Sequence, residues 1–202
     1  MYIDEHSAVG VPVGERAGRM EEGLRLLRRL WTEEEVTNEG DYYPMHQVAL
    51  EPKPVQPTVP LWVSSNWVQR GLRRVAELGD SWITNVPRVD TFKDCWQKVQ
   101  ENSEKIGRNP FDLNRCLYIS VNLNSDADAL REGDQFMQAY YSRPYEAVSK
   151  QLLCVFGPPQ KCIDTIRAYQ EAGINYFIVR FASPNQSQQL AAFTNEVLPA
   201  VR

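Results

Sequence analysis

The sequence has little of the side-chain chemistry from which metal centres and disulfide frameworks are built. Its four cysteines are widely spaced and form no C-x-x-C pair: Cys95, Cys116, Cys154 and Cys162. This spacing favours reduced, mostly buried thiols over a disulfide framework or a zinc site. Only two histidines occur, which leaves little room for a histidine-rich metal centre or a histidine-based triad. We therefore expect no metal, and any redox chemistry would depend on an organic cofactor.

Positive charge and long apolar runs are also lacking. A net charge of -4 argues against nucleic-acid binding, which needs clustered lysine and arginine. No apolar run approaches the roughly 20 residues that a membrane span requires. The first ten residues, MYIDEHSAVG, have neither the basic nor the apolar region of a signal peptide. We expect a cytoplasmic protein without a nucleic-acid or membrane partner, folded as one domain over residues 1–202.

The clearest helix is predicted over residues 13–31. Apolar side chains recur there at helical spacing, and arginines cover much of the remaining surface. The arginines could suggest an anion site. Glutamates interleaved with them favour a solvated, salt-bridged face instead.

Residues 33–60 have a different character. A turn signal stands at 38–41, and four prolines lie between Pro52 and Pro60. The pattern predicts a small hairpin followed by a stiff, extended segment. We interpret residues 33–60 as an excursion from a larger scaffold.

From Leu61 onward, short apolar strands alternate with helices. The expected strands are 61–64, 81–84, 116–123 and 176–181, and the expected helical segments are 68–78, 90–106, 126–155, 157–173 and 186–197. Gly79 and Gly107 are placed where left-handed residues end helices. Such alternation predicts an α/β fold with a parallel sheet covered by helices, either a barrel or a doubly wound sheet. A doubly wound nucleotide-binding module is disfavoured because neither glycine-rich phosphate motif occurs.

The strongest candidate site follows the first of these strands, at Ser64-Ser65-Asn66-Trp67. In a parallel α/β scaffold, ligands bind where strands end and loops lead into helices. Small polar residues before a helix can cap its free amides, or the free amides can bind an anionic phosphate. Arg70 lies in the first turn, where a cation is unfavourable unless an anion is near. From these residues alone, a simple cap is the favoured interpretation, and Trp67 could pack on its own scaffold or on a ligand.

Other strand ends carry weaker candidates. Asn85 and Asn122 could donate to a ligand, although turn and cap roles explain such asparagines equally well. Asn124 and Ser125 are expected to cap a helix that begins near Asp126. Arg180 has apolar neighbours and needs a carboxylate, a ligand or water, of which an ion pair is preferred. Trp62, inside a strand, is expected in the core.

Five segments resemble the bacterial luciferase-like flavin monooxygenases and follow that family's order over nearly the whole chain. They are GVPVGERAGRMEEGLRLLRRLWT, EPKPVQPTVPLWVSSN, RRVAELGDSWIT, FGPPQKCIDTIRAYQEAGINYFIVRFA and FTNEVLPAVR. The resemblance implies a (β/α)8 TIM barrel, of which this chain would supply the C-terminal half with strands five to eight. Strands one to four would lie outside this sequence. A half-barrel exposes two sheet edges, so we expect a homo-oligomer or a partner that supplies the other half.

The resemblance also implies a function. It indicates an oxidoreductase that uses reduced FMN or coenzyme F420 on a small-molecule substrate, with molecular oxygen as the acceptor in the monooxygenases. It shifts the balance at Ser64, Ser65, Asn66, Trp67 and Arg70 towards cofactor-phosphate binding. No catalytic residue is assigned, since the protein chiefly positions such a cofactor. The alternative is a non-catalytic remnant that associates with itself or with a full-length relative.

Overall fold

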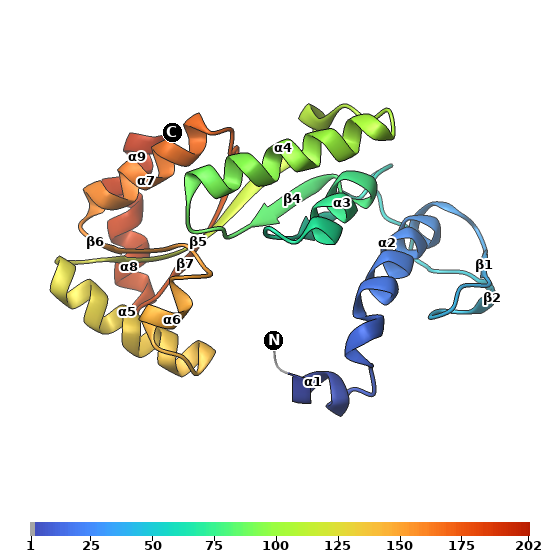
Figure 1. Ribbon diagram of the computed structural model, residues 1–202, viewed down its shortest axis with the longest axis horizontal. Coiled ribbons are helices and arrows are strands. Elements are labelled where there is room, and N and C mark those ends of the chain that lie inside the picture. Colours follow the sequence, from blue (N-terminus) through green and yellow to red (C-terminus); the bar gives the residue numbers. More distant parts are fainter. Residues whose placement is uncertain (1–2) are drawn as a thin grey trace. The chain divides into compact units, whose positions relative to one another are not determined.

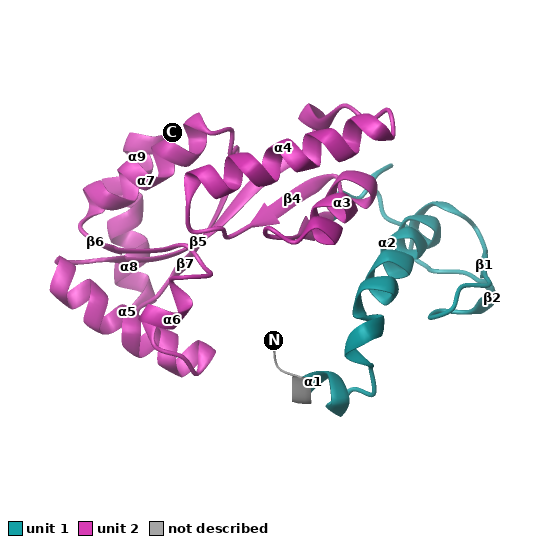
Figure 2. Cartoon of the chain, viewed as in Figure 1, with its two compact units in different colours: residues 1–61 teal, residues 62–202 magenta. Residues whose placement is uncertain are grey.

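A computed structural model describes residues 3–202, with side chains described from Glu5 onward. The chain divides into two compact units, residues 1–61 and residues 62–202 (Figure 2). The excursion predicted for 33–60 lies wholly in the first unit. Each unit is described separately.

Unit 1 is built on one long helix and a hairpin (Figure 1). A short helix, α1 (Ile3–Ala8), and a 3₁₀ turn, Val13–Glu15, precede α2 (Arg16–Thr32). Strands β1 (Val36–Asn38) and β2 (Met45–Val48) pair antiparallel. The long helix and the hairpin confirm the sequence-based expectations.

The arginine-rich face of α2 forms the salt bridges that the interleaved glutamates predict. Arg19 pairs with Glu15 at 2.8 Å, and Arg29 pairs with Glu33 at 2.9 Å. Beyond the helix, Lys53 Nζ donates to the carbonyl oxygens of Leu30 and Glu33. A cation at the carboxyl end of a helix is electrostatically favourable, so Lys53 fastens the proline-rich segment to α2.

Unit 2 contains one five-stranded sheet whose paired strands are all parallel. Its strands are β3 (Trp62–Ser64), β4 (Ser81–Thr84), β5 (Asn114–Leu123), β6 (Cys154–Gly157) and β7 (Tyr176–Phe181). The long strand β5 pairs with β4 at its start, with β6 at its end and with β7 along its middle. The predicted parallel α/β architecture is confirmed.

Strand β6 corrects the sequence-based prediction, which placed residues 126–155 in a helical region. Helix α5 (Asp126–Tyr141) ends where Ser142 adopts a left-handed φ of 53°. After the short α6 (Tyr145–Val148), the chain returns to the sheet, and Ser120 N donates to Leu153 O at 3.0 Å. A four-residue strand carries too weak a periodicity to be separated from the helices around it.

The remaining helices lie close to their expected positions. They are α3 (Gln69–Leu78), α4 (Val89–Lys105), a 3₁₀ turn (Pro110–Asp112), α7 (Pro159–Glu171), α8 (Gln186–Ala192), a π-helical turn (Phe193–Val197) and α9 (Leu198–Val201). Gly107 follows α4 with a φ of +72°, as expected for a helix-ending glycine. Gly79 does not adopt the expected left-handed conformation, because its φ is -86°.

One face of the sheet carries the main core. Residues paired in register on parallel strands share a face, as do residues two positions apart on one strand. Val63 pairs with Trp82, and Thr84, two positions further along β4, pairs with Leu117, so Val63, Trp82 and Leu117 face the same side. Trp82 is fully buried and stacks on Phe92 of α4, with ring centroids 5.3 Å apart. Phe92 in turn contacts Tyr169 of α7 edge-on. Burial of these large side chains fixes α4 and α7 over this face.

The opposite face is only partly covered, and we call it the open face. Its residues include Trp62, Ser64, Tyr118, Tyr176, Ile178 and Arg180. Helix α5 packs on β5 and β6 at the carboxyl end of this face, on the side away from α4 (Figure 1). Trp62 is 38% exposed and Tyr176 is 49% exposed, and their rings meet edge-on at 5.2 Å. The prediction that Trp62 belongs to the core is therefore wrong.

All four cysteines are free thiols, as predicted. Cys95, Cys116 and Cys162 are buried, and Cys154 is half-buried. Burial raises the pKa of Cys154 and Cys162 to about 12. These thiols are therefore neutral and unreactive at ordinary pH.

Candidate functional site

The segment Ser64–Val68 joins the end of β3 to the start of α3, at the carboxyl edge of the sheet. Ser65 continues the strand, because its backbone N–H donates to Ile83 O at 3.0 Å. The indole Nε1 of buried Trp82 donates to Ser65 O at 2.7 Å. Backbone and side-chain bonds together hold this turn against β4.

Asn66 turns its side chain towards the sheet. Its Oδ1 accepts hydrogen bonds from Thr84 Oγ1 at 3.0 Å and from Asn85 N at 3.3 Å. It therefore ties the end of β3 to the end of β4. The amide oxygen is engaged there and does not cap α3.

Helix α3 starts without a side-chain cap. Its N-cap residue is Val68, in an extended conformation, and no side chain accepts from the first-turn amides. The favoured sequence interpretation, a serine or asparagine cap, is therefore wrong. An uncapped helix start presents backbone donors and the positive end of the helix dipole to an anion.

Gly71 shapes the approach to this helix start. A Cβ placed there would clash with the Oγ of Ser65, so the Ser65 side chain lies where a larger residue at 71 would project. The Ser65 hydroxyl is thus held beside the first turn of α3. Ser64 is exposed on the open face next to it. The Ser65 hydroxyl donates to Asn66 O at 3.4 Å, and Ser64, the preceding residue of the extended chain, points to the opposite side.

Trp67 and Arg70 lie on the outer part of this turn. Trp67 is 46% exposed, and Val68 is 61% exposed. Arg70 lines a groove of about 400 Å³ with Gln69, Arg73 and Asn102, between α3 and α4. The structure thus brings Ser65 beside the first turn of α3, leaves Ser64 exposed on the open face, and places the Arg70 side chain in this neighbouring groove.

The other strand ends hold two polar groups with unsatisfied atoms. Asn122 is fully buried; its Nδ2 donates to Ala182 O and Glu132 Oε2, and its Oδ1 has no partner. Asn85 likewise has a buried Oδ1 without a partner. Ser125 caps α5 by accepting from Asp128 N, as predicted. Asn124 supports that cap by accepting from Ser125 N.

Arg180 corrects another expectation. Among the residues that the structure describes, no carboxylate lies within ion-pair distance of it. Its guanidinium lies instead over the ring of Tyr140, 4.1 Å from the centroid, and over Tyr118 at 5.3 Å. The predicted ion pair is therefore replaced by two cation–π contacts.

Several residues of the site carry no signal in the sequence. Thr84 and Glu132 support the strand ends through partners that are 18 and 10 positions distant in the chain. Gly71 could have been found, because a glycine early in an amphipathic helix lowers helix stability and calls for a packing reason. It is the contact with Ser65 that supplies this reason.

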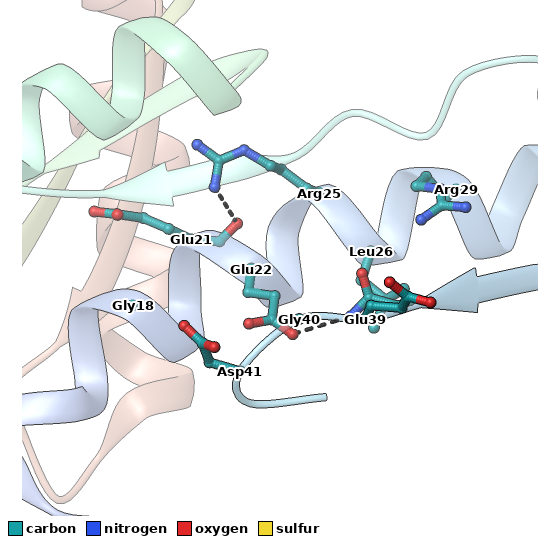
Figure 3. Close-up of a pocket in the computed structure, with 10 residues that line it drawn as sticks. Gly18, Glu21, Glu22, Arg25, Leu26, Arg29, Glu39, Gly40 and Asp41 are labelled. Carbon is teal, nitrogen blue, oxygen red and sulfur yellow. Dashed lines mark hydrogen bonds between the residues drawn. The ribbon is translucent and has the colours of Figure 1, made fainter. Parts of the chain in front are cut away.

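A hollow of about 540 Å³ lies within unit 1, between α2 and the hairpin turn (Figure 3). Glu22 lines this hollow, and its carboxylate accepts hydrogen bonds from the backbone N–H groups of Tyr42 and Tyr43 and from Asn38 Nδ2. The carboxylate therefore holds the hairpin turn. Within the described residues, no cluster of histidine, cysteine and carboxylate side chains could hold a metal ion. No helix among them is long and apolar enough to cross a membrane.

Comparison with known proteins identifies the group to which this arrangement belongs. A profile described as luciferase-like monooxygenase matches residues 3–176. The chain belongs to this family. Similar members include F420-dependent glucose-6-phosphate dehydrogenases from Kribbella flavida and Intrasporangium calvum, which are 27% and 28% identical over 210 residues. Each alignment covers 93% of this chain and 62% of the relative, so the chain spans less than two thirds of these relatives' length.

Solved structures of other proteins share the fold. An F420-dependent secondary alcohol dehydrogenase, solved with an F420-acetone adduct, matches 94% of this chain and 63% of its own, with a TM-score of 0.78 and 23% identity. The monooxygenase RslO1 from Streptomyces bottropensis matches 98% of this chain and 66% of its own, with a TM-score of 0.75 and 19% identity. The luciferase-like TIM-barrel relationship expected from the sequence is thereby confirmed.

Proposed function

We propose that the chain is part of a luciferase-like oxidoreductase that uses reduced FMN or coenzyme F420 on a small-molecule substrate. The bound cofactor would supply the redox chemistry. Ser64, Ser65 and the backbone of Asn66–Val68 would hold its phosphate. The observation that carries this proposal is the uncapped start of α3, with the Ser65 hydroxyl beside it in the space that Gly71 leaves free.

Both cofactors stay in the proposal. The relatives from Kribbella flavida and Intrasporangium calvum are named as F420-dependent. A riboflavin lyase with modified FMN also matches 98% of this chain, with a TM-score of 0.74. Reaction with molecular oxygen, as in a monooxygenase, is the form that the family description supports. A phosphate site at α3 serves either cofactor, because both carry a phosphate ester.

The test is a titration of the full chain with FMN and, separately, with F420, followed by cofactor fluorescence. We expect Ser65→Asp to abolish binding, because it places a negative charge against the phosphate. Ser187→Asp is the matched control, since it adds the same charge in the first turn of α8 on an exposed residue. Equal affinity of the wild type and Ser65→Asp would exclude the phosphate site.

A non-catalytic chain that associates with itself or with a full-length relative is the second candidate. It is favoured by the open face, where Trp62, Tyr176 and Ile178 are each more than a third exposed. Exposed apolar patches of this kind mark association surfaces. Under either function we propose a homo-oligomer or a partner that covers this face. We also place the protein in the cytoplasm, a proposal supported by its four free thiols.

Size-exclusion chromatography with light scattering tests this association. Ile178→Lys should lower the molar mass, because a charge on the open face would be buried on association. Phe111→Lys is the control, since Phe111 is 67% exposed on the 3₁₀ turn and not on the open face. A monomeric wild type would rule out self-association.

A further inference from the structure

Arg180 lies on the open face, and no carboxylate of the described residues pairs with it. It is the penultimate residue of β7, in register with Ser120 of β5. Its sequence neighbours, Val179 and Phe181, are apolar. Its guanidinium lies over the rings of Tyr140 and Tyr118.

The guanidinium is held in a defined orientation. Its Nη1 is enclosed and has no hydrogen-bond acceptor, while the residue as a whole is only half-buried. Cation–π contacts offset part of the cost of this placement, but a partly buried charge is stabilised fully only by an anion. An arginine fixed against aromatic rings presents a planar set of donors that matches a carboxylate.

Tyr140 leads from the cation to Phe136, which borders a hollow that Arg180 and Tyr140 do not themselves line. Tyr140 stacks on Phe136, with centroids 5.7 Å apart and an interplanar angle of 6°. Phe136 lines a hollow of about 370 Å³ together with Ser183 and Pro184. This hollow lies beyond the carboxyl end of β7, the edge at which parallel α/β sheets bind ligands.

We propose that Arg180, Tyr140 and Phe136 form a binding site for a planar organic carboxylate. Arg180 takes the carboxylate, and the rings of Tyr140 and Phe136 take the apolar body. Tyr140 is 56% exposed, so the part of its ring that Arg180 and Phe136 leave uncovered can contact a ligand. The inference rests on the proposed function, for which it makes the small-molecule substrate an organic acid.

The nearby phenols do not compete for the cation. Burial raises the pKa of Tyr118 to about 12 and raises that of Tyr141 as well, with Arg180 acting in the opposite direction on both. Both hydroxyls are therefore neutral at physiological pH. The positive charge of Arg180 stays available to an external anion.

The experiment is a calorimetric titration of the full chain with benzoate and with benzamide, its uncharged counterpart of similar shape. We expect benzoate to bind at millimolar concentration and benzamide to bind at least about tenfold more weakly, as expected for loss of a charged hydrogen bond. Arg180→Gln should weaken benzoate binding by a similar factor. Arg131→Gln is the matched control, because Arg131 is an exposed arginine of α5.

A second variant, Tyr140→Leu, tests the site in case Arg180→Gln does not fold. Tyr140 is exposed, so its replacement leaves the core intact. This variant should also weaken benzoate binding, with an unchanged near-ultraviolet circular dichroism signal from the buried Trp82. The proposal is overturned by absent benzoate binding in the wild type, by equal binding of benzamide, or by full benzoate affinity in Arg180→Gln. A changed molar mass with unchanged benzoate affinity in Arg180→Gln would assign the cation to a protein contact instead.

The cofactor site of the proposed function and the carboxylate site are tested independently. Ser65→Asp should lose the cofactor and keep benzoate binding, because the two sites use different strands. Benzoate binding without any FMN or F420 binding would support the carboxylate site and refute the cofactor proposal.

Discussion

Asn66 and Thr84 join the ends of two neighbouring strands: Thr84 Oγ1 donates to Asn66 Oδ1 at 3.0 Å. Thr84 is buried, and the same Oδ1 also receives the backbone N–H of Asn85. A single side-chain oxygen thus satisfies two donors from β4 and fixes the turn that precedes α3. The shape of the candidate phosphate site depends on this oxygen.

Replacing Asn66 by alanine should destabilise the protein by about 1–3 kcal/mol, because two donors lose their acceptor. Urea unfolding measures the loss in free energy. Gln97→Ala is the control, because Gln97 makes only an exposed bond to Glu101 on α4. A loss no larger than that of Gln97→Ala would show that water replaces Asn66 without cost. Cofactor affinity should fall together with stability, since the turn loses its anchor.

Gly71→Ala should destabilise the protein although alanine favours helices by about 1 kcal/mol over glycine. The new Cβ would overlap Ser65 Oγ. Gly23→Ala in α2 is the matched control, because its Cβ would meet only Tyr43 at an ordinary 3.5 Å, and it should be neutral or stabilising. Thermal unfolding of both variants checks the difference.

Ser65→Gly should rescue Gly71→Ala, because it removes the overlapping side chain. A double-mutant cycle between positions 65 and 71 would then give a coupling energy of about 0.5–3 kcal/mol. Additive effects of the two changes would contradict the contact between these positions.

The hairpin of unit 1 should loosen in acid. Burial alone would raise the pKa of Glu22, but hydrogen bonds from the backbone of Tyr43 and Tyr42 outweigh it and lower the pKa. A lowered carboxyl pKa contributes stability that is present above the ordinary value and is lost as the pH falls through the lowered one. Amide exchange of Tyr42 and Tyr43 should therefore speed up below about pH 4 beyond its intrinsic rate.

Glu22→Gln should produce the same loosening at neutral pH, since the two carboxylate oxygens accept three bonds and the glutamine amide has only one acceptor oxygen. Glu34→Gln, at an exposed position of the same segment, should have no effect. Unchanged exchange at Tyr42 and Tyr43 in Glu22→Gln would show that the hairpin does not depend on this carboxylate.

Unit 2 should lose stability in alkali. Burial raises the pKa of Cys116 to about 11 and that of Cys154 to about 12. A raised pKa contributes stability that is complete below the unfolded value and is lost as the pH rises towards the folded value. The free energy of unfolding should therefore fall from about pH 8.5 upward, where unfolded thiols ionise.

Urea unfolding between about pH 8 and 10 measures this fall. Cys154→Ala should reduce its slope, because one buried thiol no longer resists ionisation. The native thiols should also react slowly with a thiol reagent at neutral pH. Rapid modification of all four cysteines in the folded protein would contradict the burial that the structure shows.

Local sequence patterns were enough to predict the long helices and most of the strands. Apolar spacing placed α2 and α4, the Gly-Pro-Pro start and the glycine at the end placed α7, and the run Tyr176–Phe181 placed β7. Strand β6 was not predicted, because its four residues follow a helix-rich segment and are held in the sheet by pairing with β5, from Ser120 to Leu123. Strand pairing of this kind is set by tertiary contacts and leaves little trace in a short sequence.

At the site, the sequence located the turn but not the roles of its side chains. Ser64–Trp67 was recognised because small polar residues stood where a strand ends. Asn66 was expected to be free for a cap, and it bonds instead to Thr84, a partner 18 residues away. Arg180 was expected to find a carboxylate, and the rings that meet it belong to two other elements. Such partners follow from the fold and not from spacing.

Strand β5 is the strand through which the sheet of unit 2 is held together. Strands β6 and β7 each pair only with β5, and one further bond, from Leu153 N to Asn85 O at 2.9 Å, joins the start of β6 to the end of β4. An edge strand such as β3 can fray while the rest persists, but opening β5 detaches every other pair except β3–β4. In native-state hydrogen exchange, the amides of Leu117, Ile119 and Val121 should therefore exchange only when the whole unit unfolds. The order of opening would run from the two edges inward and reach this strand last.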